Sequence, residues 1–124
     1  MAKTILIVED NAIQAQLIKD VLEHKGFKTV CASDGVVAQI MVLEHRPDLV
    51  LMDIQLPGIS GLEVTKFIRA DATLKETPVV AVTAFASKSE AENIRAAGCD
   101  NILTKPFAVS DLREIVVRYI GEAV

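Results

Sequence analysis

The stretch LVLMDIQLPGISG, residues 49–61, places a carboxylate directly after a run of apolar side chains. Residues 49–52 are all apolar, Asp53 follows them, and a Pro-Gly turn lies just beyond. An apolar run of this kind is typical of a strand that is buried on both faces. A carboxylate at the end of such a strand costs free energy unless something compensates it. The stretch therefore predicts a buried strand that ends at a polar site.

Strand and helix patterns alternate five times along the chain. The expected strands cover residues 4–8, 27–32, 48–53, 78–83 and 101–104. The expected helices cover residues 11–25, 36–45, 60–69, 87–97 and 109–120. In the first helix the apolar residues with helical spacing are Ile13, Leu17, Ile18, Val21 and Leu22. Short connections between alternating strands and helices predict a parallel sheet with helices on both faces.

The order of the strands follows from how apolar each one is. Strands 4–8, 48–53 and 78–83 are the most uniformly apolar and are expected at the centre, whereas Lys28 and Thr29 suit an edge strand. A doubly wound, flavodoxin-like α/β fold with order 2-1-3-4-5 satisfies this pattern. In that order Cys31 and Cys99 lie on opposite edges, too far apart for a disulfide. We expect both to be small buried hydrophobes.

Composition restricts the classes of function. The chain has 124 residues, with 13 basic and 17 acidic side chains and a net charge of −4, which favours one globular domain, 1–124. No basic stripe supports nucleic-acid binding, and no apolar run is long enough to cross a membrane. The N-terminus reaches two acids directly after its apolar run, unlike a signal peptide. We therefore expect a cytoplasmic protein with no nucleic-acid or membrane partner.

Polar residues follow four of the predicted strands. Glu9 and Asp10 follow the first strand, Asp53 and Thr83 end the third and fourth, and Lys105 follows the fifth. The carboxyl ends of parallel strands share one edge, so these side chains should meet there. Three crowded carboxylates repel one another unless a cation is present. Oxygen ligands with no His or Cys nearby suit Mg²⁺.

Each of these residues also has a purely structural interpretation. Glu9 and Asp10 are acids at a helix N-terminus, where the helix dipole favours them. Asp53 precedes a Pro-Gly turn, and Thr83 and Lys105 are ordinary strand and loop residues. The purely structural interpretation requires all of these explanations to hold at once, each at the end of the right strand. A common site explains the same residues with one hypothesis, so we favour it.

The segments VEDN, LVLMDIQLPGISG, VVAVTAFA and TKPF together resemble the receiver domain of bacterial two-component response regulators. The resemblance runs from residue 4 to residue 121. Within the family, the wording around residue 53 is similar to that of single-domain members that regulate cell division. The chain ends just past the last expected helix, so we expect a single receiver domain without an output domain.

The resemblance implies a role for each residue at the sheet edge. Asp53 would be the phosphoacceptor, and Thr83 and Lys105 would contact phosphoryl oxygens. Mg²⁺ would be held by Glu9, Asp10, Asp53 and the backbone carbonyl of Gln55. The protein would catalyse its own phosphorylation and dephosphorylation rather than act as an enzyme on other substrates. A carboxylate nucleophile with positioned neutralising groups agrees with this chemistry.

The resemblance also implies a switch and a decay rate. Thr83 and the residue three before Lys105 would move together, and Ile102 stands there in place of the family's aromatic residue. A cis peptide bond would join Lys105 to Pro106. Gln55 and Phe85 would flank the path of attacking water, and the bulk of Phe85 predicts slow dephosphorylation.

The expected partners are a sensor histidine kinase or a histidine phosphotransferase, together with a downstream protein. The downstream protein would bind the surface formed by helix 87–97, strand 101–104 and helix 109–120. A monomer or a weak phosphorylation-dependent dimer is expected. The alternative is a protein-interaction module on the same fold that works without phosphorylation. A flavin carrier is disfavoured, because the two acids after strand 4–8 would repel a flavin phosphate.

Overall fold

The computed structural model describes residues 2–84 and 87–123. The strands are β1 (Thr4–Val8), β2 (Lys28–Ala32), β3 (Leu49–Asp53), β4 (Val79–Thr83) and β5 (Asn101–Thr104). The helices are α1 (Ala12–His24), α2 (Gly35–His45), α3 (Gly61–Ala70), α4 (Lys88–Ala96) and α5 (Val109–Ile120). Every element was predicted, and the predicted bounds differ from these by one residue at most.

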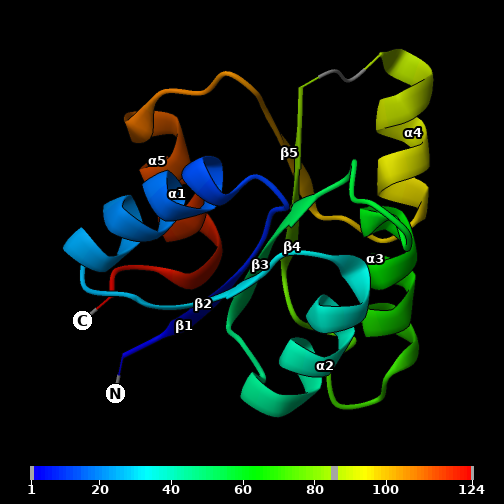
Figure 1. The fold of residues 1–124 in the computed structure, drawn as a ribbon, viewed down its shortest axis with the longest axis horizontal. Helices are drawn as coiled ribbons and strands as arrows, with labels where there is room; N and C mark the ends of the chain where they lie inside the picture. Colours follow the sequence, from blue (N-terminus) through cyan, green and yellow to red (C-terminus); the bar gives the residue numbers. More distant parts are fainter. Residues whose placement is uncertain (1, 85–86, 124) are drawn as a thin grey trace.

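The strands form one parallel sheet in the order β2-β1-β3-β4-β5, which confirms the predicted topology. Figure 1 shows α1 and α5 on one side of this sheet and α2, α3 and α4 on the other. The edge strand β2 has two exposed residues, Lys28 and Cys31, whereas each of the other strands, all of which are described, has at most one. The central strands β3 and β4 are buried throughout, as the apolar runs predicted.

Alternation along each strand divides the core into two halves. Ile5, Ile7 and Leu51 face the half that contains residues of α1 and α5. Leu6 and Met52 face the half that contains residues of α2, α3 and α4. Side chains of a strand alternate between its two faces, so one apolar strand serves both halves. This is why the strand sequences are continuous apolar runs.

The helices begin where the sequence provides a capping side chain. Asn11 accepts a hydrogen bond from the N–H of Gln14 and so caps α1 directly after the two acids that follow β1. Asp34, Ser60 and Ser87 cap α2, α3 and α4 in the same way. Such caps satisfy backbone N–H groups that have no partner inside the helix. None of the described helices is long and apolar enough to cross a membrane.

One prediction about burial is wrong, and the buried face of α1 is narrower than its apolar spacing suggests. Ile13 and Leu17 share the helical spacing of the buried residues of α1, yet they are 82% and 54% exposed. The buried residues of α1 are Ile18 and Leu22, so the apolar face of the helix is wider than the face that touches the sheet. Cys31 is exposed on the edge strand, where it borders a hollow beside α1; Cys99 is buried, as expected.

The two free thiols should therefore react at different rates. We expect a thiol reagent to modify Cys31 in the folded protein and Cys99 only after unfolding, because Cys31 is exposed and Cys99 is buried. Burial raises the pKa of both thiols, so the difference in rate comes from access to the reagent and not from the pKa. The measurement is a thiol titration before and after denaturant. Cys31→Ser should remove the rapid reaction, and rapid modification of two thiols in the native wild type would contradict the predicted difference.

Candidate functional site

The register of the sheet brings the predicted polar residues to one edge. Val8 pairs with Met52, so Glu9 and Asp53 come directly after paired residues on neighbouring strands. Asp53 pairs with Val82, the residue before Thr83. Thr83 in turn pairs with the last residue of β5, and Lys105 follows. The carboxyl ends of β1, β3, β4 and β5 therefore supply the site.

Three carboxylates form the floor and rim of the site. Glu9 and Asp53 are buried, with 4% and 6% of their surface exposed, while Asp10 is exposed. One oxygen from each carboxylate lies within 4.8 Å of the others. Carboxylates grouped beside solvent suit Mg²⁺, which binds proteins through one or two carboxylates and keeps several of its water ligands. The donor set therefore fits a magnesium ion.

Lys105 neutralises part of this negative charge. Its Nζ lies 2.7 Å from Oε1 of Glu9 and 3.4 Å from Oδ2 of Asp53. Burial lowers the pKa of Lys105, but the hydrogen bond to Glu9 and the charges of Asp53 and Glu9 outweigh it, so the pKa is raised above its usual value. The ammonium group is therefore charged at neutral pH. In this structure Lys105 is closer to Glu9 than to Asp53, which the sequence did not indicate.

Backbone groups hold the two buried carboxylates. The N–H of Gln55 donates to Oδ1 of Asp53 at 2.9 Å, and the N–H of Asn11 donates to Oε2 of Glu9 at 3.2 Å. These bonds come from the residues that follow β3 and begin α1. Each buried acid is thus oriented by its own loop and faces Lys105 with its other oxygen.

Thr83 and Ile102 lie behind the site. Thr83 is 2% exposed, and its carbonyl accepts the N–H of Lys105 at 2.8 Å. Ile102 is partly buried and packs against the half of the core under α2, α3 and α4. The peptide bond between Lys105 and Pro106 is cis. Phe85, predicted to slow dephosphorylation, lies outside the described residues.

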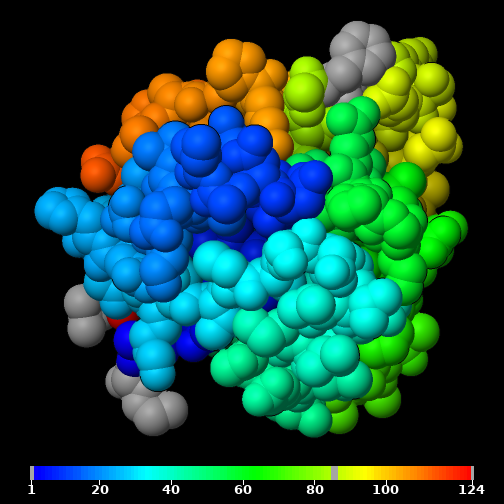
Figure 2. All heavy atoms as spheres, in the orientation of Figure 1, coloured from blue at the N-terminus to red at the C-terminus, as the bar shows by residue number. Residues whose placement is uncertain are grey.

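Two hollows border the site along α1. One, of about 310 Å³, is lined by Glu9 and Asp10 together with residues of α1, β2 and Val37. The other, of about 290 Å³, is lined by Lys105 and Pro106 together with Gln14 and Leu17 of α1. Figure 2 shows α1, in blue, standing above α2, in cyan, on this face of the molecule. Sequence reasoning placed none of these α1 residues near the site.

The profile of the response regulator receiver domain matches residues 5–117. The chain belongs to this family. The match covers most of the chain, from β1 to the last turn of α5.

Relatives with an assigned role match over their full length. The polar-differentiation response regulator DivK of Brucella anthropi is 46% identical over 123 residues, which is 99% of this chain and 100% of DivK. DivK of Brucella ovis is also 46% identical, with the same coverage. The chain is thus a receiver domain homologous to the DivK proteins.

Solved structures show the same fold. The chemotaxis protein CheY4 of Vibrio cholerae superposes with a TM-score of 0.92 at 26% identity, covering 96% of this chain and 99% of CheY4. A receiver domain of a sensor histidine kinase from Pseudomonas aeruginosa superposes with a TM-score of 0.90 at 34% identity, covering 98% of this chain and all of that chain. That structure has a magnesium ion coordinated in its active site cleft.

Proposed function

We propose that this chain is a stand-alone response regulator that accepts a phosphoryl group on Asp53 from a phosphohistidine protein. The observation that carries the proposal is the position of Asp53, buried at the end of β3 and in contact with the ammonium group of Lys105. The full-length match to DivK, a polar-differentiation regulator, supports a role in cell polarity or division. Polarity or division control through protein contacts needs no separate output domain, so we propose one receiver domain over residues 1–124.

The chemistry is the transfer of a phosphoryl group between two side chains. A carboxylate oxygen of Asp53 bonds to phosphorus as the bond from phosphorus to the donor nitrogen breaks, and the electron pair of that bond stays on the imidazole. Lys105 and the Thr83 hydroxyl would bind phosphoryl oxygens. In dephosphorylation, the oxygen of a water molecule would bond to phosphorus as the bond from phosphorus to the Asp53 oxygen breaks. Inorganic phosphate leaves, and the Asp53 carboxylate is restored. Both steps would be the protein's own activity.

Magnesium is part of the proposal. Glu9, Asp10 and Asp53 would hold the ion with the carbonyl of Gln55, and the ion would offset negative charge on the phosphoryl group. The close approach of three carboxylate oxygens supports this assignment. The magnesium ion in the Pseudomonas aeruginosa receiver structure supports it independently.

Signalling would follow from a change in protein contacts. We propose that Thr83 and Ile102 report phosphorylation to the surface made by α4, β5 and α5, where a downstream protein binds. Ile102 supports this because it packs in the half of the core that contains Ile94 of α4. The phosphoryl donor would be a histidine kinase or a histidine phosphotransferase. The protein would act in the cytoplasm. It would be a monomer or a weak phosphorylation-dependent dimer.

The test is chemical phosphorylation followed by mass. Incubation with acetyl phosphate and Mg²⁺ should add one phosphoryl group to the wild type, because this small donor can react at the site without a partner protein. Asp53→Asn should gain none, and omission of Mg²⁺ should prevent the gain. The measurement is the intact mass of each protein after the same incubation.

Asp20→Asn is the matched control, because Asp20 is an exposed carboxylate on α1 away from the β3 end. This variant should gain the phosphoryl group as the wild type does. If the wild type stays unmodified while it binds Mg²⁺, the proposed phosphoacceptor role is wrong. The phosphorylation-independent interaction module would then be the better description.

A further inference from the structure

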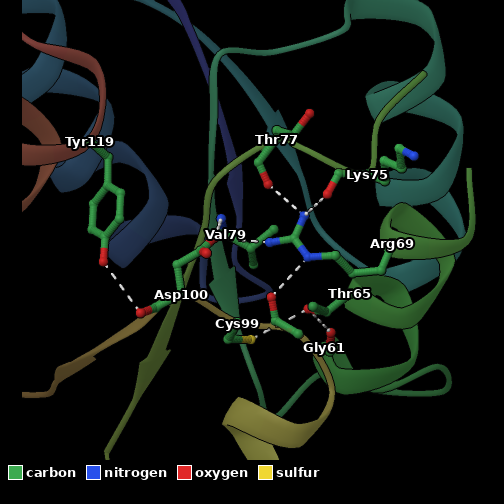
Figure 3. A network of polar contacts seen from close by, with 10 residues as sticks. Gly61, Thr65, Arg69, Lys75, Thr77, Val79, Cys99, Asp100 and Tyr119 are labelled. Atoms are coloured by element: carbon green, nitrogen blue, oxygen red, sulfur yellow. Dashed lines mark hydrogen bonds and ion pairs between the residues drawn. The ribbon is translucent and has the colours of Figure 1, made fainter. Parts of the chain in front are cut away.

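Arg69, near the end of α3, connects the loop after its own helix with the turn after α4, which lies about 30 residues further along the chain. Its Nε donates to the carbonyl of Gly98 at 2.9 Å. One terminal nitrogen donates to the carbonyls of Lys75 and Thr77 at 3.1 and 2.6 Å, and the other contacts the Asp100 carboxylate at 2.9 Å. Figure 3 shows the guanidinium group among these acceptors. We call Arg69, Gly98 and Asp100 the Arg69 clamp.

Asp100 of the clamp also accepts hydrogen bonds from two neighbouring elements, β4 and α5. The Asp100 carboxylate also accepts the N–H of Val79 at the start of β4, at 2.9 Å. The Asp100 carbonyl accepts the hydroxyl of Tyr119 from α5, at 3.3 Å (Figure 3). Gly98 has φ +111°, and a Cβ there would lie 2.7 Å from Cγ of Arg69. The turn after α4 therefore needs glycine both for its backbone and for the approach of the arginine.

Helix α4 has little else to hold it. Ile94 is its only buried residue among residues 88–96, all of which are described. Ala97 and Cys99, just past the helix, are buried, and the Sγ of Cys99 lies 3.6 Å from the hydroxyl of Thr65 on α3. The contacts that fix this helix thus gather at its C-terminal end. A segment with few buried contacts opens more readily than the core.

The N-terminal end of α4 is attached differently. It begins at Lys88, five residues after Thr83, the buried hydroxyl residue at the end of β4, and its cap is the side chain of Ser87. The phosphoacceptor edge and the Arg69 clamp lie at opposite ends of β4, since Val79 contacts the clamp and Thr83 borders the site. The N-terminal end of α4 is therefore connected to the phosphoacceptor site, and its C-terminal end is connected to the Arg69 clamp.

We propose that the Arg69 clamp fixes the C-terminal end of α4, so that changes at the phosphoacceptor site displace the N-terminal end of this helix selectively. Arg69 is then a positioning residue for the signalling surface, although it lies at the opposite end of the sheet from Asp53. The part of the proposal that concerns phosphorylation rests on the proposed function. The fixed end itself does not, and it can be measured without any phosphoryl group.

The first experiment compares amide hydrogen exchange in the unphosphorylated wild type and Arg69→Met. Methionine keeps an unbranched apolar stem beside Gly98 but removes every donor. In the wild type, the amides of residues 97–100 should exchange at least about tenfold more slowly than that of Ala91 in the first turns of α4. In Arg69→Met this difference should disappear, while the amides of β1 keep their wild-type rates.

Arg95→Met is the matched control, because Arg95 is an exposed arginine on α4 itself. It should keep the wild-type difference between the two ends of the helix. Arg69→Lys keeps a charge but not the fork of donors, so its exchange should lie between those of wild type and Arg69→Met. Unchanged protection of residues 97–100 in Arg69→Met would overturn the proposal. An equal rise in β1 would also overturn it, because Arg69 would then act on global stability alone.

The second experiment adds acetyl phosphate and Mg²⁺. In the wild type, exchange should change in residues 88–92 and stay constant in residues 97–100, whereas in Arg69→Met it should change at both ends. A uniform change along the wild-type helix would contradict the fixed end. If no phosphoryl group is gained, the proposed function fails, and the unphosphorylated comparison still decides whether the clamp exists.

Discussion

Lys105→Met should slow the phosphorylation of Asp53 by acetyl phosphate by about 10²-fold while it tightens the binding of Mg²⁺. In the wild type the ammonium group contacts both Glu9 and Asp53. Its loss leaves three neighbouring carboxylates without a counter-charge, and the incoming phosphoryl oxygens without their donor. Removal of one donor aimed at developing charge typically costs 10²–10³ in rate. The measurement is the rate of mass gain at saturating Mg²⁺.

The metal affinity should change in the opposite direction. Lys105 and a bound cation both neutralise Glu9 and Asp53, so removal of the ammonium group should tighten Mg²⁺ binding by about tenfold. Equilibrium titration with Mg²⁺ tests this. A misfolded variant would lose both properties, so opposite changes exclude misfolding as the cause. Lys66→Met, at an exposed lysine of α3, should alter neither property. Weaker Mg²⁺ binding by Lys105→Met would show that the lysine does not compete with the ion.

The ion pairs of Lys105 with Glu9 and Asp53 also make the stability of the folded protein depend on pH. The pKa of Lys105 is raised in the folded protein, so its favourable charge interactions are complete at neutral pH. They are lost only as the pH rises past the usual lysine value of 10.5 and through the higher folded pKa. The difference in unfolding free energy between wild type and Lys105→Met should therefore be constant near pH 7 and shrink above about pH 10.5. Denaturant titrations at both pH values measure it.

The fold was predictable because each strand carries its own signal. Residues 49–52 and 79–82 are buried on both faces, which is why they read as unbroken apolar runs. The site was predictable for a related reason. Parallel strands align their carboxyl ends, so Glu9, Asp53, Thr83 and Lys105 had to meet at one edge once the topology was known.

Other features leave no pattern in the sequence. Ile13 and Leu17 repeat with the period of the buried face of α1, and only the width of the contact with the sheet decides that they are exposed. The approach of Lys105 to Glu9 depends on side-chain reach and not on residue type. Three of the acceptors of Arg69 are backbone carbonyls, which any residue supplies. Contacts of this kind become visible only in three dimensions.

Gly61→Ala should destabilise the protein by about 3 kcal/mol, because the new methyl group meets backbone atoms that have no room to move. A Cβ at Gly61 would lie 2.3 Å from the carbonyl oxygen of Asp53 and 2.9 Å from Cα of Ile54. The first turn of α3 therefore packs directly against the end of β3. For a chain of this size a loss of about 3 kcal/mol lowers the melting temperature by roughly 10–20 °C. Thermal unfolding followed by circular dichroism measures the change.

Gly58→Ala separates this steric effect from the ordinary cost of replacing a glycine. Gly58 has φ +74° and nothing lies within 4 Å of the added methyl group, so only the left-handed backbone is penalised. That cost is about 1–2 kcal/mol. The excess loss in Gly61→Ala then measures the clash with the end of β3. Since the clashing atom belongs to Asp53 itself, Gly61→Ala should also slow phosphorylation by acetyl phosphate, measured well below its melting temperature. If Gly61→Ala were no less stable than Gly58→Ala and phosphorylated as fast as wild type, the close approach of α3 would not be what positions Asp53.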